Sequence, residues 1–171
     1  HNPGEPLNFL DHHIKCGDAI VGLAHRDELM RGIATEAFKV LQGDDKEVAS
    51  GLAKRNKKER DTRGQQVLDF EGKLNDGLED ALVAYRAFAS LPEGTPEEIA
   101  AKAVAYERVR KNGALARLKD VADLQVAQFF IPKDAAHKDR LVSDATYFRI
   151  LGGREGMEPL VAAEVMVESM R

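Results

Sequence analysis

Three residues near the start of the chain, His12, His13 and Cys16, have side chains that bind metal ions. On a helix, His12 and Cys16 would share a face, while His13 would point a quarter-turn or more away. A structural zinc site usually has four protein ligands and a catalytic one three, so this set is too small. The pattern favours packing or hydrogen bonding, and we expect no metal site.

Cys16 is the chain's one cysteine, which excludes an internal disulfide and fits a reducing compartment. As a nucleophile it needs a base and an orienting residue, and the sequence assigns neither. The Ser, His and acidic residues show no local signature of a hydrolase either. We therefore predict that the chain contains no catalytic residue.

A basic run at residues 54–60 contains Lys54, Arg55, Lys57 and Lys58, which are the candidates for contact with DNA phosphates. A solvated helix face explains the run without any function and is the favoured interpretation, with DNA contact as the alternative. The net charge of −4 argues against a chain that grips nucleic acid over its whole surface. Any contact with DNA must therefore be local.

The composition favours helices as the elements that position these residues. Hydrophobic residues make up 43% of the 171 residues and aromatic residues only 6%, so the apolar surface comes from Leu, Val, Ile and Ala. The chain suits one domain, or a compact body with a projecting element. No apolar run reaches the roughly 18 residues that span a bilayer. We expect no membrane partner and a cytoplasmic location.

Two long helices are predicted in the middle of the chain. The first follows an N-cap at Asp44 or Asp45 and carries apolar residues at spacings of three and four: Val67, Phe70, Leu74, Leu78, Ala81, Tyr85 and Phe88. The second begins at a capping box of Thr95 and Glu98 with Pro96 between them, and extends to about residue 131. The fold class is therefore mainly α, with a long antiparallel, coiled-coil-like helical hairpin over about 44–131.

Shorter helices are expected to pack against this hairpin. Apolar spacing predicts them at about 26–41, with a possible break near Gly32, at 141–151 and at 158–170. Residues 26–171 then form a helical domain, preceded by a lead-in segment at 1–25.

The lead-in segment carries a resemblance to a known family. Residues 6–22 read Pro-Leu-Asn-Phe-Leu-Asp-His-His-Ile-Lys-Cys-Gly-Asp-Ala-Ile-Val-Gly. They resemble a stretch of large class I restriction-modification and phage-defence DNA methyltransferases that modify adenine. Weaker similarities follow in order at 37–38, 43–46, 54–57, 91–97 and 129–133. The resemblance covers residues 2–133.

The resemblance implies the helical insert between the cofactor-binding motifs and the catalytic Asn-Pro-Pro-aromatic motif of such an enzyme. The full-length enzyme would bind S-adenosylmethionine and DNA. This chain would be inactive alone, because Asn2-Pro3 is followed by Gly4 and no Asn-Pro-Pro occurs. It would bind no cofactor, because the glycine loop that holds the methionine part of the cofactor in this family is absent. Asp18 resembles the residue that contacts the cofactor's adenine, where relatives more often have Asn.

Within that interpretation the insert acts as a scaffold or positions DNA, and its partner is the remainder of the methyltransferase chain. A freestanding helical adaptor is the alternative, because the apolar seam at 67–88 could equally face a second protein as a coiled coil.

Overall fold

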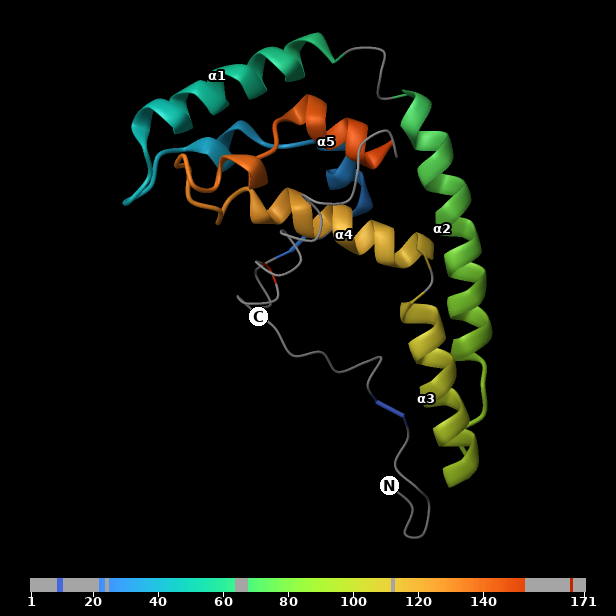
Figure 1. The fold of residues 1–171 in the computed structure, drawn as a ribbon. Coiled ribbons are helices and arrows are strands. Elements are labelled where there is room, and N and C mark those ends of the chain that lie inside the picture. The colour runs from blue at the N-terminus through green and yellow to red at the C-terminus, as the bar shows by residue number, and fades with distance from the viewer. Residues whose placement is uncertain are drawn as a thin grey trace. The chain divides into compact units, whose positions relative to one another are not determined.

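The computed structural model describes residues 9–10, 22–23, 25–63, 68–111, 113–152 and 167. Within these ranges the chain is mainly helical and contains no β-strand, which confirms the predicted mainly α class (Figure 1). No helix in the described part combines the length and the apolar character needed to cross a membrane. The α-helices are α1 (Lys46–Thr62), α2 (Leu68–Ala89), α3 (Pro96–Arg110), α4 (Gly113–Ala127) and α5 (Asp144–Leu151).

Three short 3-10 helices accompany them: η1 (Arg26–Arg31), η2 (Thr35–Phe38) and η3 (Lys138–Arg140). The chain divides into two compact units. Unit 1 comprises residues 1–17 and 74–118, and unit 2 comprises residues 18–73 and 119–171. Helices α2 and α4 therefore contribute residues to both units.

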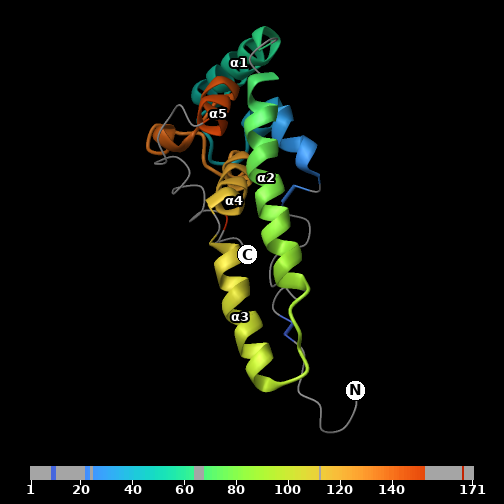
Figure 2. The same ribbon diagram turned by 90° about the vertical axis from the view of Figure 1, so that its right-hand side faces the viewer.

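Unit 1 is built on an antiparallel pair, the C-terminal part of α2 and the whole of α3, joined by a tight turn (Figures 1 and 2). The predicted capping box is confirmed: the Thr95 hydroxyl accepts from the Glu98 N–H, and the Glu98 carboxylate accepts from the Thr95 N–H. The Lys102 ammonium donates to the carbonyls of Ala89 and Leu91 and pairs with Glu93. These bonds close the turn because they satisfy carbonyls at the end of α2.

The core of unit 1 is aromatic. Phe9, Phe88 and Tyr106 are buried, with ring centroids 5.4 to 6.4 Å apart in edge-to-face and tilted arrangements. Val109 completes the buried cluster. Ala81 and Phe88 of the predicted seam are buried, whereas Tyr85 is 39% exposed.

In unit 2, α1 packs against η2 and α5. Asp45 is the N-cap of α1, as predicted, and its carboxylate accepts from the N–H groups of Glu47 and Val48. The neighbouring Asp44 carboxylate accepts from the Lys133 N–H at 2.9 Å, and the Lys133 carbonyl accepts from the Asp45 N–H. The start of α1 and the segment after α4 are therefore joined by one bond to a side chain and one bond between backbones.

The structure divides each of the two long helices that periodicity predicted. Where one helix was expected up to about residue 90, α1 ends at Thr62 and α2 begins at Leu68, with residues 64–67 outside the described ranges. The Arg63 N–H bonds to the Arg60 carbonyl, a tightened last turn of the kind that closes helices. Residues 54–66 contain no apolar residue, so the apolar spacing stops well before the break and resumes at Val67.

The second predicted helix is divided into α3 and α4. The sequence Asn112-Gly113 lies at the junction, and both residue types are poor helix formers. Helix α4 ends at Ala127 rather than near residue 131, because the N–H groups of Phe129 and Phe130 bond to carbonyls three residues back. Pro132 favours this ending, since the residue before a proline is restricted to extended backbone.

Among the shorter helices, the segment predicted at 26–41 forms two 3-10 helices. Helix η1 ends at Arg31 and η2 begins at Thr35, so the chain breaks at Gly32 as predicted. Helix α5 starts at Asp144, three residues later than predicted, and ends at Leu151 as predicted. The helix predicted at 158–170 lies outside the described residues except for Val167, which is buried.

Candidate functional site

Helix α1 presents two chemically different faces. Its outer face carries Lys54, Arg55, Lys57 and Lys58, all of which are exposed. Its inner face buries Asn56, in the middle of the same basic run. The predicted DNA-contact residues are therefore brought together on one surface, because positions three and four apart on a helix are neighbours.

Arg55 differs from the three lysines. Its Nε donates to Glu59 Oε1 at 2.7 Å, and Glu59 Oε2 accepts from the Ala145 N–H at 2.9 Å. Burial acts to raise the pKa of Glu59, but hydrogen bonds from the Ala145 N–H and from Arg55, together with the charge of Arg55, outweigh it and lower that pKa. Within the described ranges, Lys54, Lys57 and Lys58 form no ion pair.

Lysine ammonium groups in such an arrangement bind phosphate as mobile point charges. Contacts of this kind position a duplex without reading its bases, and they weaken steeply as salt increases. The outer face of α1 is therefore suited to local, sequence-independent contact with a phosphate backbone.

The inner face of α1 holds a buried polar network. The Asn56 side chain donates to the Ile33 carbonyl and accepts from the Asp144 N–H, both at 2.8 Å. The Asp144 carboxylate is fully buried; it accepts from the Ile33 N–H at 3.1 Å and from Arg63 Nη1 at 3.2 Å. Burial raises the pKa of Asp144 despite the neighbouring guanidinium groups of Arg63 and Arg60.

Gly32 makes this network possible. Its φ of 69° lies in the left-handed region, and a Cβ atom there would lie 2.0 Å from Asp144 Oδ1, 2.6 Å from Arg63 Nη1 and 2.8 Å from the Phe148 ring. Neither the backbone conformation nor the space accepts a side chain. The chain between η1 and η2 can therefore approach α5 closely only with glycine at this position.

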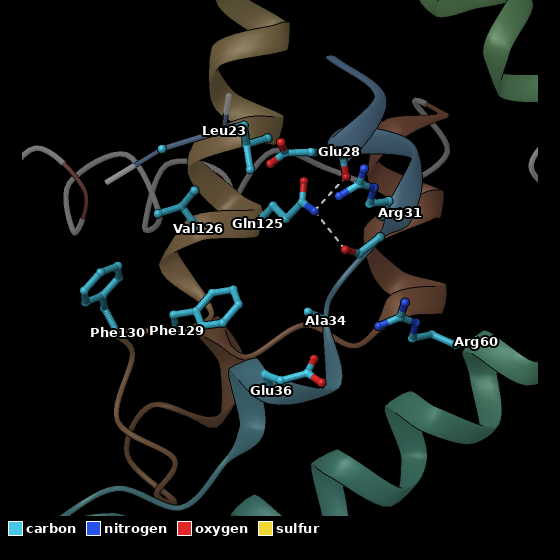
Figure 3. A pocket seen from close by; sticks show the side chains of 12 residues that line it. Leu23, Glu28, Arg31, Ala34, Glu36, Arg60, Gln125, Val126, Phe129 and Phe130 are labelled. Atoms are coloured by element: carbon cyan, nitrogen blue, oxygen red, sulfur yellow. Dashed lines mark hydrogen bonds between the residues drawn. The ribbon is translucent and has the colours of Figure 1, made fainter. Parts of the chain in front are cut away.

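A pocket of about 460 Å³ opens beside this network, within unit 2 (Figure 3). In the close view, Phe129 and Phe130 lie on one side and Arg31 and Arg60 on the opposite side. Glu28 and Glu36 add carboxylates, and Gln125, Val126, Ala34, Leu23, Gly22 and Gly32 complete the lining. Its size falls within the range of about 300–1,000 Å³ typical of small-molecule sites.

The Gln125 side chain fixes the wall of this pocket. Its amide donates to the carbonyls of Glu28 at 2.9 Å and Gly32 at 2.8 Å, and its oxygen accepts from the Tyr147 hydroxyl. The amide is therefore committed to holding η1 against α4 and α5. Recognition in the pocket falls to the aromatic rings and the charged groups.

Other residues singled out from sequence lie outside the described ranges. These are Asp18, the candidate cofactor contact, and His12, His13 and Cys16, the weak metal candidates. Among the described residues, no group of three or more His, Cys, Asp or Glu side chains is placed to hold a metal ion.

Sequence reasoning missed the pocket and the polar network. Arg63 and Asp144 are separated by 81 residues and Gln125 and Gly32 by 93, so no local pattern pairs them. One signal was available: Phe129 and Phe130 are two adjacent aromatic residues at a helix end, in a chain with few aromatic residues.

Comparison of the chain with models of protein families, with curated proteins and with solved structures finds no match.

Proposed function

We propose that this chain is the helical insert of a DNA adenine methyltransferase of a restriction-modification or phage-defence system, and that it serves as scaffold and positions DNA. Methyl transfer from S-adenosylmethionine belongs to the remainder of the enzyme. The observation that carries the proposal is the ordered series of motifs resembling that family, from residues 6–22 to 129–133.

The structural roles of the motif residues support a scaffold. The segment at 43–46 caps α1 and bonds to Lys133 of the segment at 129–133. Asn56, within the segment at 54–57, joins two backbone segments of unit 2, and the segment at 91–97 contains the turn before α3. Each of these segments, which resemble the methyltransferase family, therefore contributes to packing or to helix capping. The exposed side chains of the basic run are the exception.

The outer face of α1 supports contact with DNA. Replacing Lys54, Arg55, Lys57 and Lys58 together by Ala is expected to weaken binding of the chain to a DNA duplex. For every phosphate that is no longer neutralised, the slope of log K against log salt should become shallower by about 0.9. Fluorescence anisotropy across a salt series measures that slope. The matched control replaces four exposed basic residues elsewhere by Ala, namely Lys39, Arg86, Arg108 and Lys138.

Both variants change the net charge by the same amount. Equal slopes for the two variants would remove α1 as a specific DNA contact and leave only the interpretation as a solvated face.

The incompleteness of the cofactor site is tested separately. Isothermal titration of the chain with S-adenosylmethionine is expected to show no tight binding, because the proposal assigns the cofactor pocket to the remainder of the enzyme. Micromolar affinity would contradict this part of the proposal.

A second candidate function is a helical adaptor that binds another protein through a coiled coil. It is favoured by apolar residues exposed on α2: Leu82 at 44%, Val83 at 64% and Tyr85 at 39%. A partner helix would bury these side chains, of which only Tyr85 belongs to the seam predicted at 67–88. Sedimentation velocity at several concentrations distinguishes the two functions, since a monomer at all concentrations contradicts self-pairing through this surface.

A further inference from the structure

The pocket in unit 2 contains two exposed aromatic rings on a hydrogen-bonded turn at the end of α4. Phe129 and Phe130 are 41% and 42% exposed, although the neighbouring Ala127 and Ile131 are buried. The turn that carries the rings is held by bonds from Phe129 N–H to the Val126 carbonyl and from Phe130 N–H to the Ala127 carbonyl. The next residues are tied to the start of α1 through Lys133 and Asp44. Hydrogen bonds on both sides therefore fix the segment that carries the two rings.

The opposite side of the pocket supplies guanidinium groups (Figure 3). Arg60 is anchored because its Nη1 donates to the Ile33 carbonyl at 3.2 Å, which leaves its other N–H groups for further partners. Arg31 is exposed at the end of η1. Guanidinium groups bind phosphate through paired hydrogen bonds, and they also stack on planar rings.

The carboxylates of Glu28 and Glu36 stand between these two sides. A carboxylate accepts hydrogen bonds from exocyclic amino groups, as it does from cytosine in protein–DNA contacts. Aromatic rings, carboxylate acceptors and guanidinium donors around one cavity match three features of a nucleotide: a planar base, the amino group on that base and the phosphate.

We infer that this pocket binds an unpaired nucleotide whose base carries an exocyclic amino group, with the base against Phe129 and Phe130 and the phosphate at Arg31 and Arg60. The inference rests on the proposed function in one respect, that DNA is the nucleic acid encountered. Helix α1 joins the two surfaces, because it offers Arg60 to the pocket from its inner side and lysines to solvent from its outer side.

The test is binding of the whole chain to short single strands, measured by fluorescence anisotropy. The probes are a deoxyadenosine hexamer, a thymidine hexamer and an abasic hexamer with the same number of phosphates. We expect the deoxyadenosine hexamer to bind about tenfold more tightly than the abasic one, because base–aromatic stacking adds to backbone attraction. The thymidine hexamer should bind less tightly than the deoxyadenosine hexamer, since thymine has no exocyclic amino group.

Two variants place the effect in the pocket. Phe129→Leu with Phe130→Leu keeps apolar side chains but removes the rings, and should abolish most of the preference for base-containing strands. Glu36→Gln should reduce the preference for deoxyadenosine over thymidine. Val104→Ala, at an exposed apolar position of α3, is the matched control and should change neither preference.

Equal binding of the abasic and deoxyadenosine hexamers would overturn the inference, as would a base preference that survives loss of both rings. Failure of the proposed function appears differently. The four-residue variant of the α1 face could leave duplex binding unchanged while the hexamer preference still depends on Phe129 and Phe130. That result would support the nucleotide pocket and contradict the duplex contact.

Discussion

The two units of this chain are stabilised by different kinds of contact. Unit 1 joins helices that are neighbours in sequence around buried aromatic rings, and the residues bonded to Lys102 are only 9 to 13 positions away. Unit 2 combines an apolar core with a buried polar network. In that network, the Tyr147 hydroxyl bonds to the Leu29 carbonyl across 118 residues.

Apolar and polar cores respond differently to substitution. Loss of an apolar side chain leaves a space that neighbours partly fill, whereas loss of one polar partner leaves a buried group with its full desolvation cost. Unit 1 should therefore tolerate changes that preserve volume. Unit 2 should tolerate very few changes around Gly32 and Asp144, even conservative ones.

The largest effect is expected at Gly32. Gly32→Ala should destabilise unit 2 by more than about 4 kcal/mol, because it combines unfavourable backbone with overlap of a buried ion pair. Urea denaturation followed by circular dichroism measures the change. The matched control is Gly51→Ala on α1, where nothing lies within 4 Å and the helix should gain about 0.5–1 kcal/mol. Similar stabilities for the two variants would contradict the close approach at Gly32.

In unit 1 the largest effect is expected at Phe88. Phe88→Ala should cost about 3–5 kcal/mol, because the ring contacts Phe9 and Tyr106 at the centre of the cluster. Phe88→Leu keeps most of the apolar volume and should cost less than about 1.5 kcal/mol. Urea denaturation measures the free energy of unfolding of the two variants. A leucine variant as damaged as the alanine variant would show that unit 1 needs specific ring geometry.

Asn56 gives the corresponding test for the polar network. Asn56→Ala should cost about 2–3 kcal/mol, since the buried Asp144 N–H loses its acceptor while the Ile33 carbonyl keeps Arg60. Lys57→Ala, next in sequence but on the exposed face, should change stability by less than about 0.5 kcal/mol. Equal effects on the urea midpoint would be evidence against a buried role for Asn56.

The smallest effect is a pair of opposite pH dependences within unit 2. The pKa of Glu59 is lowered by folding, so its stabilising contribution is present above its ordinary pKa of 4.5 and is lost as pH falls through the folded value. The pKa of Asp144 is raised, so its contribution is fully present below its ordinary pKa of 3.8 and is lost as pH rises through the folded value.

Urea midpoints measured between about pH 3 and pH 7 for the natural chain, Glu59→Gln and Asp144→Asn separate the two groups. The advantage of the natural chain over Glu59→Gln should grow as pH rises, and its difference from Asp144→Asn should move the other way. Differences that change in the same direction would contradict the opposite environments assigned to these carboxylates.

Much of the secondary structure followed from local chemistry. The cap at Asp45, the capping box at Thr95 and the break at Gly32 were predictable because each depends on residues within a few positions of one another. The breaks after Thr62 and Arg110 were not predicted, although residues 54–66 contain no apolar residue and Asn112-Gly113 are poor helix formers. The exposure of the basic run on α1 was also predictable, because consecutive charged residues on a helix are costly to bury.

The sequence by itself determined a mainly helical chain, its caps and a solvent-facing basic surface, since these depend on short-range hydrogen bonds, helical period and hydration of charge. Only the tertiary structure decided that Asn56 turns inward, that Arg63 meets Asp144 and that Phe129 and Phe130 face Arg31 and Arg60 across a pocket. These pairings join residues far apart in sequence. The polar pairings of Asn56 and of Arg63 with Asp144 form because a buried polar group requires a partner, and folding supplies one from a distant part of the sequence.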